Sequence, residues 1–554
     1  MTPPTPPGAD DTAQFNADAS IAFQPSVGEA RSIHGIVVDN SDVGWSFTAG
    51  SGPLTIGEGG ITVNNADWNP ASRSTTISIP IIVTGTQTWH ATGGDEWRTR
   101  HSLIVDGPVS GSGRIVFDGF ATRLTSTNGL TFGGGARMTD GCRTSFTLDD
   151  VFLNANLDFG VGHGPIIVDD GWFQVQARLA AGSGSDLEIR CTNAFIVTEN
   201  GGACDAAAHR RDYGGTIISP KIRFTGPMQL GGDLIVSSFF GYYSNPSGGN
   251  SDNTVAGSFQ GPITLDHTGT ACLALREQGD SRGAYTFVEG TIADGSPHTY
   301  FSPLILQGGM NALNVESTGN TYSDGTIIDS VQAWDDAGFE GGVRVADGSE
   351  LGTGDVTVLP AGILMLANTN SLAVGSGSRI RLQSSDTAMS ILEISGDFDA
   401  SQILADDAYG TLMLGSDGAQ VDDMSEVGNG NMYLGGSRVH GVPWQDGTVC
   451  SVSSLAPCSD GDWRFGCVGP YFSRYGHYGT AENGTLQFTE AGVINGSGTM
   501  RVGSHARYGG GYVRFYGDIS GFTGDMDIRR GGVIGRALAA AGSKTLGDPS
   551  GNVS

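Results

Sequence analysis

Gly60-Ile61-Thr62-Val63-Asn64, a run of alternating apolar and polar residues, is followed after a small-residue spacer by a second such run, Thr76-Ile77-Ser78-Ile79-Pro80. Alternation of this kind, bounded by Gly, Asn and Pro, is typical of β-strands with one buried face. The same unit of Gly-rich bend, strand, spacer and strand recurs along the chain, which holds 89 glycines among 554 residues. This pattern predicts an all-β protein, specifically a right-handed parallel β-helix (β-solenoid) with loop insertions.

Further strand patterns surround this stretch, at residues 35–38, 45–48, 54–56, 103–105, 114–117 and 130–132. Groups of two or three strands return about every 20–30 residues, which is the behaviour expected of stacked coils. Helical patterns are short and few, and the best candidates are residues 174–181, 206–211 and 535–542. We therefore expect little or no helix.

Composition excludes several classes of protein. Hydrophobic residues make up 38% of the chain and charged residues 16%, which fits neither a membrane bundle nor a charged disordered tail. The net charge of −29 repels nucleic-acid phosphates and anionic membranes, so we expect no nucleic-acid partner and no membrane insertion of this segment. Residues 1–7 lack the basic and apolar regions of a secretory signal, so none is predicted in this chain.

Changes in composition divide the chain into segments. We expect a flexible Pro-rich leader (1–18), β-solenoid (19–199), an insertion-rich segment on the solenoid (200–260), β-solenoid (261–439), a Cys/aromatic loop insertion (440–480) and β-solenoid (481–554). No polar cap follows the last strand pattern. The sequence therefore predicts that the solenoid continues beyond the chain end, as in a fragment or one piece of an assembly.

Three stretches carry a family resemblance. The first runs from Gly44-Trp45-Ser46-Phe47 through Gly52-Pro53-Leu54-Thr55-Ile56-Gly57 to Val109-Ser110-Gly111-Ser112-Gly113. The second joins Asn320-Thr321-Tyr322-Ser323-Asp324-Gly325-Thr326 to Gly352-Thr353-Gly354-Asp355-Val356-Thr357-Val358, and a weaker third spans residues 493–524. This order resembles the autotransporter-associated β-strand repeat proteins, bacterial surface or secreted proteins with parallel β-helical passenger regions. The resemblance implies extracellular display and specifies no ligand.

Two sets of residues are candidates for binding or cross-linking. Aromatic residues in the two insertions are candidate binding residues, because exposed loop aromatics are often used in recognition: Phe239, Tyr242, Tyr243, Trp444, Trp463, Tyr471 and Tyr475. If the chain is extracellular, some of its seven cysteines are candidates for disulfides, with Cys191–Cys204 and two of the last three as local pairs: Cys191, Cys204, Cys450, Cys458 and Cys467.

Metal and cofactor signals are sparse. No Cys/His spacing typical of zinc is present, so no metal ligands are assigned. No organic cofactor is expected. Calcium is a candidate ion because paired aspartates recur in turns, although such residues need no ligand to explain them.

One local constellation suggests catalysis. Gly162-His163-Gly164 precedes Asp169-Asp170-Gly171, and β-helical polysaccharide hydrolases use paired aspartates with a nearby His. The two motifs are too close together to occupy matching positions on successive coils, and both are common turn sequences. Nucleophile-elbow, P-loop and zinc-protease signatures are absent from the sequence. No catalytic residue is assigned.

The sequence favours a non-enzymatic extracellular structural or adhesive β-solenoid that forms or decorates a bacterial cell surface, surface layer or appendage. Its expected partners are other copies of itself or surface-assembly proteins, with glycans as further candidates. A phage tail fibre or tailspike subunit that binds a host glycan on a virion is the first alternative. A polysaccharide lyase or glycoside hydrolase on the same scaffold is the second.

Overall fold

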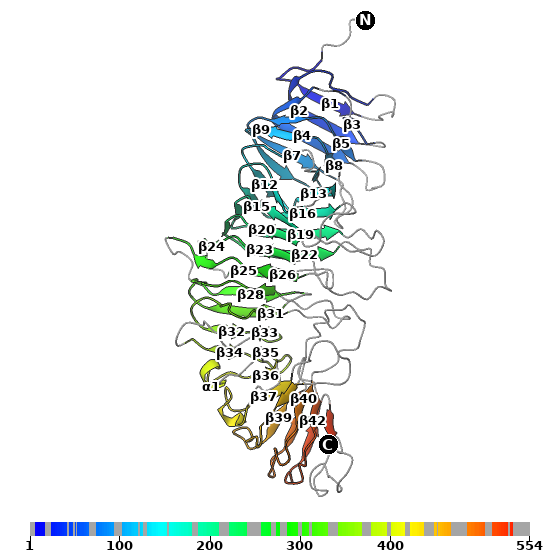
Figure 1. The fold of residues 1–554 in the computed structure, drawn as a ribbon. Coiled ribbons are helices and arrows are strands. Elements are labelled where there is room, and N and C mark those ends of the chain that lie inside the picture. Colours follow the sequence, from blue (N-terminus) through cyan, green and yellow to red (C-terminus); the bar gives the residue numbers. More distant parts are fainter. Residues whose placement is uncertain are drawn as a thin grey trace. The chain divides into compact units, whose positions relative to one another are not determined.

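A computed structural model describes most of the repeating part of the chain. The described residues are 6–16, 24–40, 44–47, 50, 52–65, 74–92, 102–119, 122–125, 130–151, 155–179, 187–209, 221–240, 256–266, 273–277, 285–296, 302–309, 313–330, 342–367, 378–395, 400–415, 421–436, 448–450, 452–466, 485–504, 512–529 and 532–535. They form two compact units, Met1–Gly269 with Gly295–Thr299, and Thr270–Asp294 with Tyr300–Ser554. Each unit is a stack of parallel strands (Figure 1), which confirms the predicted all-β parallel β-helix.

The first unit contains strands of three parallel sheets. The first sheet runs in the order β1 (Thr12–Asn16), β2 (Arg31–Asn40), β4 (Leu54–Asn65), β7 (Thr86–Ala91), β10 (Arg114–Asp118), β12 (Ala136–Thr139), β15 (Ile166–Asp169), β18 (Phe195–Val197), β21 (Met228–Leu230) and β24 (Ile263–Leu265), with β6 (Ile81–Val83) and β9 (Val109–Gly111) branching from β4. The second runs β3 (Ser46–Phe47), β5 (Thr75–Ile77), β8 (Leu103–Val105), β11 (Thr122–Thr125), β13 (Arg143–Val151), β16 (Gly171–Leu179), β19 (Gly202–His209) and β22 (Leu234–Phe240). The third runs β14 (Leu157–Phe159), β17 (Glu188–Cys191), β20 (Lys221–Phe224) and β23 (Ala256–Phe259).

The second unit is built in the same way. One row of strands is β25 (Ala274–Glu277), β28 (Leu304–Gly308), β30 (Thr326–Ser330), β32 (Val356–Val358) and β34 (Ile380–Leu382). Another is β26 (Tyr285–Val288), β29 (Leu313–Val315), β31 (Val343–Val345), β33 (Ile363–Leu366), β35 (Ile391–Ile394), β36 (Thr411–Leu414), β37 (Tyr433–Gly436), β39 (Trp463–Phe465), β41 (Met500–Val502) and β43 (Met526–Ile528). A short sheet holds β38 (Thr448–Cys450), β40 (Thr485–Phe488), β42 (Tyr512–Phe515) and β44 (Gly532–Gly535); β27 (Ile292–Asp294), α1 (Ala400–Ile403) and a 3₁₀ turn (Met424–Glu426) complete the described elements.

One full coil of the first unit spans about 30 residues, at the upper end of the predicted repeat. Side chains that meet on neighbouring coils are separated by 29 residues between Ser145 and Gln174 and by 31 residues between Gln174 and Asp205. Short strands such as β5 and β8 bury their first and third residues and leave the middle one partly exposed. Alternate residues therefore line the interior of the coil, as the period-2 pattern predicts.

Aromatic side chains stack along the interior of the first unit. The column begins with Trp89 against Phe117, with ring centroids 5.8 Å apart, and continues to Phe146 at 6.0 Å. Phe173 lies 5.2 Å from Phe146 and contacts further rings on later coils. Because each of these four side chains is at most 1% exposed, the column is a continuous dry core that links successive coils.

The second unit has aromatic contacts of its own. Phe465, Phe488 and Phe515 meet at centroid distances of 5.5 to 6.3 Å. Trp463 packs against Phe522 at 5.7 Å. Aliphatic residues fill the interior elsewhere, as in β33 and β36, where Leu and Ile residues are fully buried.

Gly60, the first residue of the alternating run at residues 60–64, occupies a position that requires glycine. Gly60 has φ +61°, and a Cβ at this position would lie 1.9 Å from the Thr88 carbonyl oxygen of the next coil. The two strand patterns predicted at residues 54–56 and 61–63 form the single strand β4, whose pairing with β2 shifts register between Ile33 and Gly35. Gly60 therefore allows β4 to remain one continuous strand through the register shift, while Thr88 of the next coil lies in close contact with its backbone.

Several sequence expectations need correction. The helix candidates at 174–181 and 206–211 fall largely in strands β16 and β19, because pairing with neighbouring coils outweighs the local propensity of their Ala and Gln residues. The ladder begins at β1, within the segment expected to be a flexible leader, since Thr12–Asn16 pair with residues 35–39 of β2. Segment 200–260 supplies β19 to β23 to the same sheets as the strands before it.

Within the described residues, no helix is long and apolar enough to cross a membrane.

Candidate functional site

A buried polar site of the first unit lies on the outward side of β13, β16, β19 and β22. The parallel register places Ser145 beside Gln174, Gln174 beside Asp205, and Asp205 beside Ser237. On β16 the inward positions are occupied by the core residue Phe173 and its neighbour Val175, so Gln174 points away from the interior. Gln174 and Asp205 are nevertheless 0% exposed. We call these four residues the Asp205 row.

Hydrogen bonds connect the Asp205 row from coil to coil. Ser145 Oγ donates to Gln174 Oε1 at 2.6 Å, and Gln174 Nε2 donates to Asp205 Oδ2 at 3.3 Å. Ser237 Oγ donates to Asp205 Oδ1. Gln176 Nε2 adds a bond to Gln174 Oε1 at 2.7 Å within the same strand. The row therefore joins four successive strands of one sheet by side chains as well as by backbone.

Arg143 supplies the positive charge of this site. Its guanidinium lies 3.9 Å from the centroid of the Trp172 ring, a cation–π arrangement, and one nitrogen lies 3.5 Å from Asp205 Oδ2. The side chains of Arg143 and Asp205 are 7% and 0% exposed. Burial of an ion pair is costly unless hydrogen bonds satisfy both groups. Asp205 meets this condition through its three described donors, and its oxygens are used for holding neighbouring coils together.

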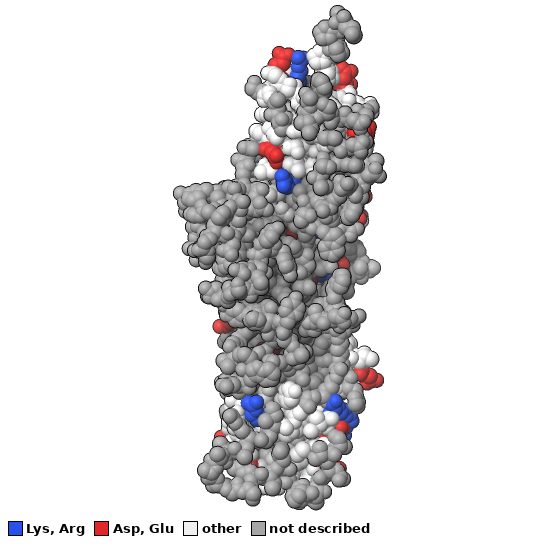
Figure 2. Space-filling view, turned by 90° about the vertical axis from the view of Figure 1, so that its right-hand side faces the viewer, with Lys and Arg blue, Asp and Glu red and all other residues white. Residues whose placement is uncertain are grey.

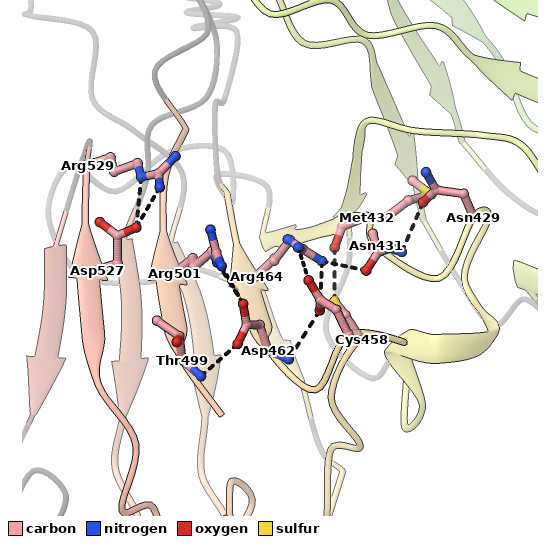
Figure 3. A network of polar contacts seen from close by, with 11 residues as sticks. Asn429, Asn431, Met432, Cys458, Asp462, Arg464, Thr499, Arg501, Asp527 and Arg529 are labelled. Carbon is pink, nitrogen blue, oxygen red and sulfur yellow. Dashed lines mark hydrogen bonds and ion pairs between the residues drawn. The ribbon is translucent and has the colours of Figure 1, made fainter. Parts of the chain in front are cut away.

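A comparable arrangement occurs in the second unit, on β39, β41 and β43 and the turns before them (Figure 3). Arg464 donates to Asn431 Oδ1 at 2.8 Å and pairs with Asp460. Arg501 donates to Asp462 Oδ2 at 2.6 Å, and the backbone N–H of Thr499 donates to Asp462 Oδ1 at 2.8 Å. Because Asp462 precedes β39 whereas Thr499 and Arg501 belong to the next coil, these contacts also run between coils.

The electrostatics of Asp462 agree with this bracing role. Burial by itself raises the pKa of Asp462. The hydrogen bonds from Thr499 and Arg501, together with the charges of Arg501 and Arg464, outweigh burial and hold the pKa below its ordinary value of 3.8. The carboxylate is therefore ionised at neutral pH and paired, which suits an ion-pair brace better than a proton donor.

Asp169, part of the constellation that suggested catalysis, is likewise held by its neighbours. It accepts hydrogen bonds from Arg137, from Thr198 Oγ1 at 2.5 Å and from Asn200 Nδ2 at 2.8 Å. Burial raises its pKa, but these hydrogen bonds outweigh burial and the pKa lies below 3.8. Asp170, the adjacent residue, is exposed and has φ 58°, a left-handed turn conformation that Asp tolerates.

His163 lies in a turn that the next coil holds in place. The turn is fixed by Asn193, whose Nδ2 donates to the carbonyl oxygens of Gly162 at 3.3 Å and Gly164 at 2.8 Å. The His163 side chain is exposed, and its backbone N–H donates to Phe132 O at 2.9 Å. The Gly-His-Gly motif is thus explained as a braced turn.

The predicted disulfides are not formed among the described cysteines. Cys142, Cys191, Cys204, Cys450 and Cys458 are all buried free thiols, which corrects the Cys191–Cys204 pairing and excludes Cys450–Cys458. Burial raises the pKa of Cys142 and of Cys191 to about 12, and raises that of Cys204 well above its ordinary value. These thiols act as small apolar core residues, because their deprotonated form is strongly disfavoured. Cys467 lies outside the described residues.

The structure tests only one of the predicted binding aromatics. Trp463 belongs to β39, is 2% exposed and donates its indole N–H to Leu455 O at 3.1 Å, so its assignment to a recognition loop is wrong and it is a core residue. Phe239 pairs with Ala207 through the backbone ladder of β22. The other aromatic candidates lie outside the described residues: Tyr242, Tyr243, Trp444, Tyr471 and Tyr475.

Metal ligands do not cluster in the part of the chain that the structure describes. No group of three or more His, Cys, Asp or Glu side chains there is arranged to hold an ion. The calcium expectation remains without a described site.

The motif residues behind the family resemblance have structural roles. Asn320 Nδ2 donates to Glu350 O at 2.6 Å, and Asn320 Oδ1 accepts from the Ile292 N–H at 2.7 Å, so this side chain bridges neighbouring turns. Tyr322 is 0% exposed, and its hydroxyl contacts Thr326 Oγ1 at 2.8 Å. A Cβ at Gly352 would lie 2.4 Å from the Tyr322 carbonyl oxygen. The Asn-Thr-Tyr and Gly-Thr-Gly positions therefore specify how coils pack.

The Asp205 row was not identified from the sequence. Three of its four members lie in segments interpreted as a helix candidate (Gln174) or as an insertion (Asp205, Ser237). A signal was nevertheless present, because polar residues recur at outward strand positions with separations of 29, 31 and 32 residues. The predicted repeat of about 20–30 residues is a range and does not define a single separation at which these residues could be aligned.

Comparison with known proteins gave no match to a family model, to a curated protein or to a solved structure.

Proposed function

We propose that the chain is a non-enzymatic structural or adhesive β-solenoid, displayed outside a bacterial cell, that forms or decorates a surface, surface layer or appendage. The observation that carries this proposal is the double linkage between coils. Backbone ladders and an aromatic core connect them inside, and polar rows such as Ser145–Gln174–Asp205–Ser237 connect them outside. Such linkage gives a unit whose coils resist separation, which is the property needed by a surface element under mechanical load.

The state of the acidic residues supports a structural role over catalysis at the motif that suggested it. A general acid needs a proton near neutral pH, and a general base needs a free lone pair directed at substrate. Asp169 has a lowered pKa and accepts hydrogen bonds from three side chains, those of Arg137, Thr198 and Asn200. Its environment favours holding the turn in place.

Net charge supports display in solvent. The chain carries −29 charges, and acidic solenoids repel one another and anionic envelope surfaces at low ionic strength. We infer that assembly with other copies or with surface proteins depends on specific contacts, because the net charge provides no long-range electrostatic attraction between them.

Surface labelling and an activity screen test the proposal together. Antibodies raised against the purified chain are expected to label intact producing cells as strongly as permeabilised cells, and protease treatment of intact cells should remove the signal. The purified chain is expected to release no reducing ends from neutral or acidic polysaccharides. Labelling only after permeabilisation contradicts surface display. Release of reducing ends that Asp169→Asn abolishes establishes the enzyme alternative, and labelling of purified virions establishes the tail-fibre alternative.

A further inference from the structure

The first unit contains an apolar hollow at the end where its ladder begins. The hollow has a volume of about 500 Å³, within the range of roughly 300–1,000 Å³ typical of ligand sites. Its walls include Phe15 and Pro25 together with side chains that belong to the coil interior, Ile33, Ile36, Phe47 and Leu54. Each of these four interior residues is only 1 to 5% exposed, so the hollow extends the dry core outward from the first coils.

Strand β1 forms one side of this hollow and is the terminal strand of its sheet. Among the described residues it pairs with β2 alone, whereas β2, β4 and the strands that follow them along the main path to β24 have a neighbour on each side. The side chains of Ala13 and Phe15 line the hollow, and the Phe15 ring lies 5.0 Å from both Trp45 and Phe47. Gln14, between them, has an exposed side chain.

The backbone of β1 alternates between its two edges. The carbonyl oxygen of Asp11 accepts the N–H of His34 at 2.8 Å and therefore faces β2. In a parallel ladder, successive residues direct their backbone groups to opposite sides. Residues 13 and 15 thus face β2, while Thr12, Gln14 and Asn16 direct their N–H and C=O groups to the open edge, the side of β1 that pairs with no other described strand. An open edge beside an apolar hollow is the combination used in β-strand addition.

We propose that this end of the solenoid binds an extended segment of a partner protein, which adds a parallel strand to β1 and places alternate apolar side chains in the hollow. The inference goes beyond the proposed function, because it assigns a specific protein contact that is independent of where the solenoid is displayed. Continuity with the existing ladder argues for a strand: only an extended segment can satisfy the β1 edge and fill the hollow at the same time.

Charge around the hollow defines the partner further. Asp10 and Asp11 are exposed and directly precede β1, and the exposed Glu29, which lines the hollow, pairs with Arg31 of the same wall. Acidic and basic side chains are visible at the top of the molecule, near β1 (Figure 2). The excess of carboxylates favours a strand flanked by Lys or Arg. The partner segment is therefore an alternating apolar and polar strand with basic ends.

Binding of designed peptides to the full chain tests this assignment. The probe is a fluorescein-labelled nonapeptide with alternating Val or Phe and Thr residues and a Lys at each end, and fluorescence anisotropy measures binding. A peptide of the same composition with its apolar residues clustered, and one with Glu at both ends, are the controls. We expect saturable one-to-one binding of the alternating Lys peptide and binding at least about threefold weaker for each control.

Two substitutions at one position distinguish edge pairing from a surface effect. Gln14→Pro removes the N–H that faces the open edge and leaves the β2 side intact, and proline is tolerated on edge strands. It is expected to weaken peptide binding about tenfold, whereas Gln14→Ala, which keeps the N–H, should change it less than about twofold. Circular dichroism verifies that both variants are folded. Absence of saturable binding, equal binding of the clustered peptide, or no effect of Gln14→Pro overturns the proposal. A wild-type dimer in sedimentation velocity that Gln14→Pro dissociates also overturns it, by identifying a second copy as the occupant.

Discussion

Phe173 offers the sharpest test of the interior column. Its ring is 0% exposed and lies 5.2 Å from Phe146, 5.7 Å from Phe195 and 6.3 Å from Phe224. Replacing a buried Phe by Ala typically costs about 3–5 kcal/mol, through lost burial and a residual cavity. Three ring contacts, each worth about 0.5–1.5 kcal/mol beyond burial, support the upper half of that range for Phe173→Ala.

Because a solenoid coil contacts only its neighbours, the loss is expected to be local. Hydrogen exchange measured by mass spectrometry is therefore the appropriate assay. Peptides that cover β13, β16 and β19 should lose protection by roughly 700-fold to 4,000-fold, the equivalent of about 4–5 kcal/mol. Peptides that cover β1 and β2 should be unchanged.

Two control variants separate the ring column from general damage. Phe173→Leu retains most of the buried volume and should cost less than about 1.5 kcal/mol. Ile167→Ala alters a partly exposed residue on β15 and should reduce protection less than tenfold. A Phe173→Ala effect no larger than that of Ile167→Ala, or one spread evenly over both units, would refute the interior column as the local source of stability.

Three further predictions follow from other residues. Gly60→Ala should lower thermal stability by more than about 1 kcal/mol, because φ is +61° and the new Cβ would lie 1.9 Å from Thr88 O. Gly57→Ala on the same strand is the comparison in differential scanning fluorimetry, because Gly57 has no positive φ and its nearest contact to a new Cβ would be 3.3 Å. Asp169→Asn should reduce exchange protection of β15 and β18 at pH 7 by about 1–3 kcal/mol. Since the folded-state pKa of Asp169 lies below its ordinary value of 3.8, its stabilisation is fully present above that value and is lost as the pH falls through the lower folded-state pKa. The difference between wild type and variant should therefore shrink as the pH is lowered below 3.8, and a constant difference contradicts this. Iodoacetamide at pH 8 should leave Cys142, Cys191 and Cys204 unmodified in the folded chain and label them in urea, as read by peptide mass spectrometry; a Cys191–Cys204 cross-link under non-reducing conditions would contradict the free thiols.

The fold was accessible from the sequence because its signal is periodic. Runs such as residues 61–63 alternate strictly, and their inward residues Ile61 and Val63 are buried as the pattern predicts. The small-residue segment Ala206–Ala208 was misread because its conformation depends on ladder partners from coils about 30 residues away, such as Gln176 and Phe239. Local propensity contains no information about those partners.

The candidate site was harder to predict for a related reason. Asp205 and Gln174 form a row only when the coil length is known, and their separation of 31 residues includes turns of variable length. The aromatic and cysteine residues around Trp463 predict a loop at this position. The indole N–H and ring of Trp463 are satisfied by Leu455 and Phe522, contacts that composition alone does not reveal.

Single-molecule force spectroscopy of the full chain, pulled from its two ends, measures most directly whether the coils are separately linked layers. Each coil released should lengthen the chain by roughly 100 Å, the extended length of about 30 residues. The stacked-coil account predicts a series of such steps. Extension in one or two cooperative steps of several hundred ångströms would contradict it.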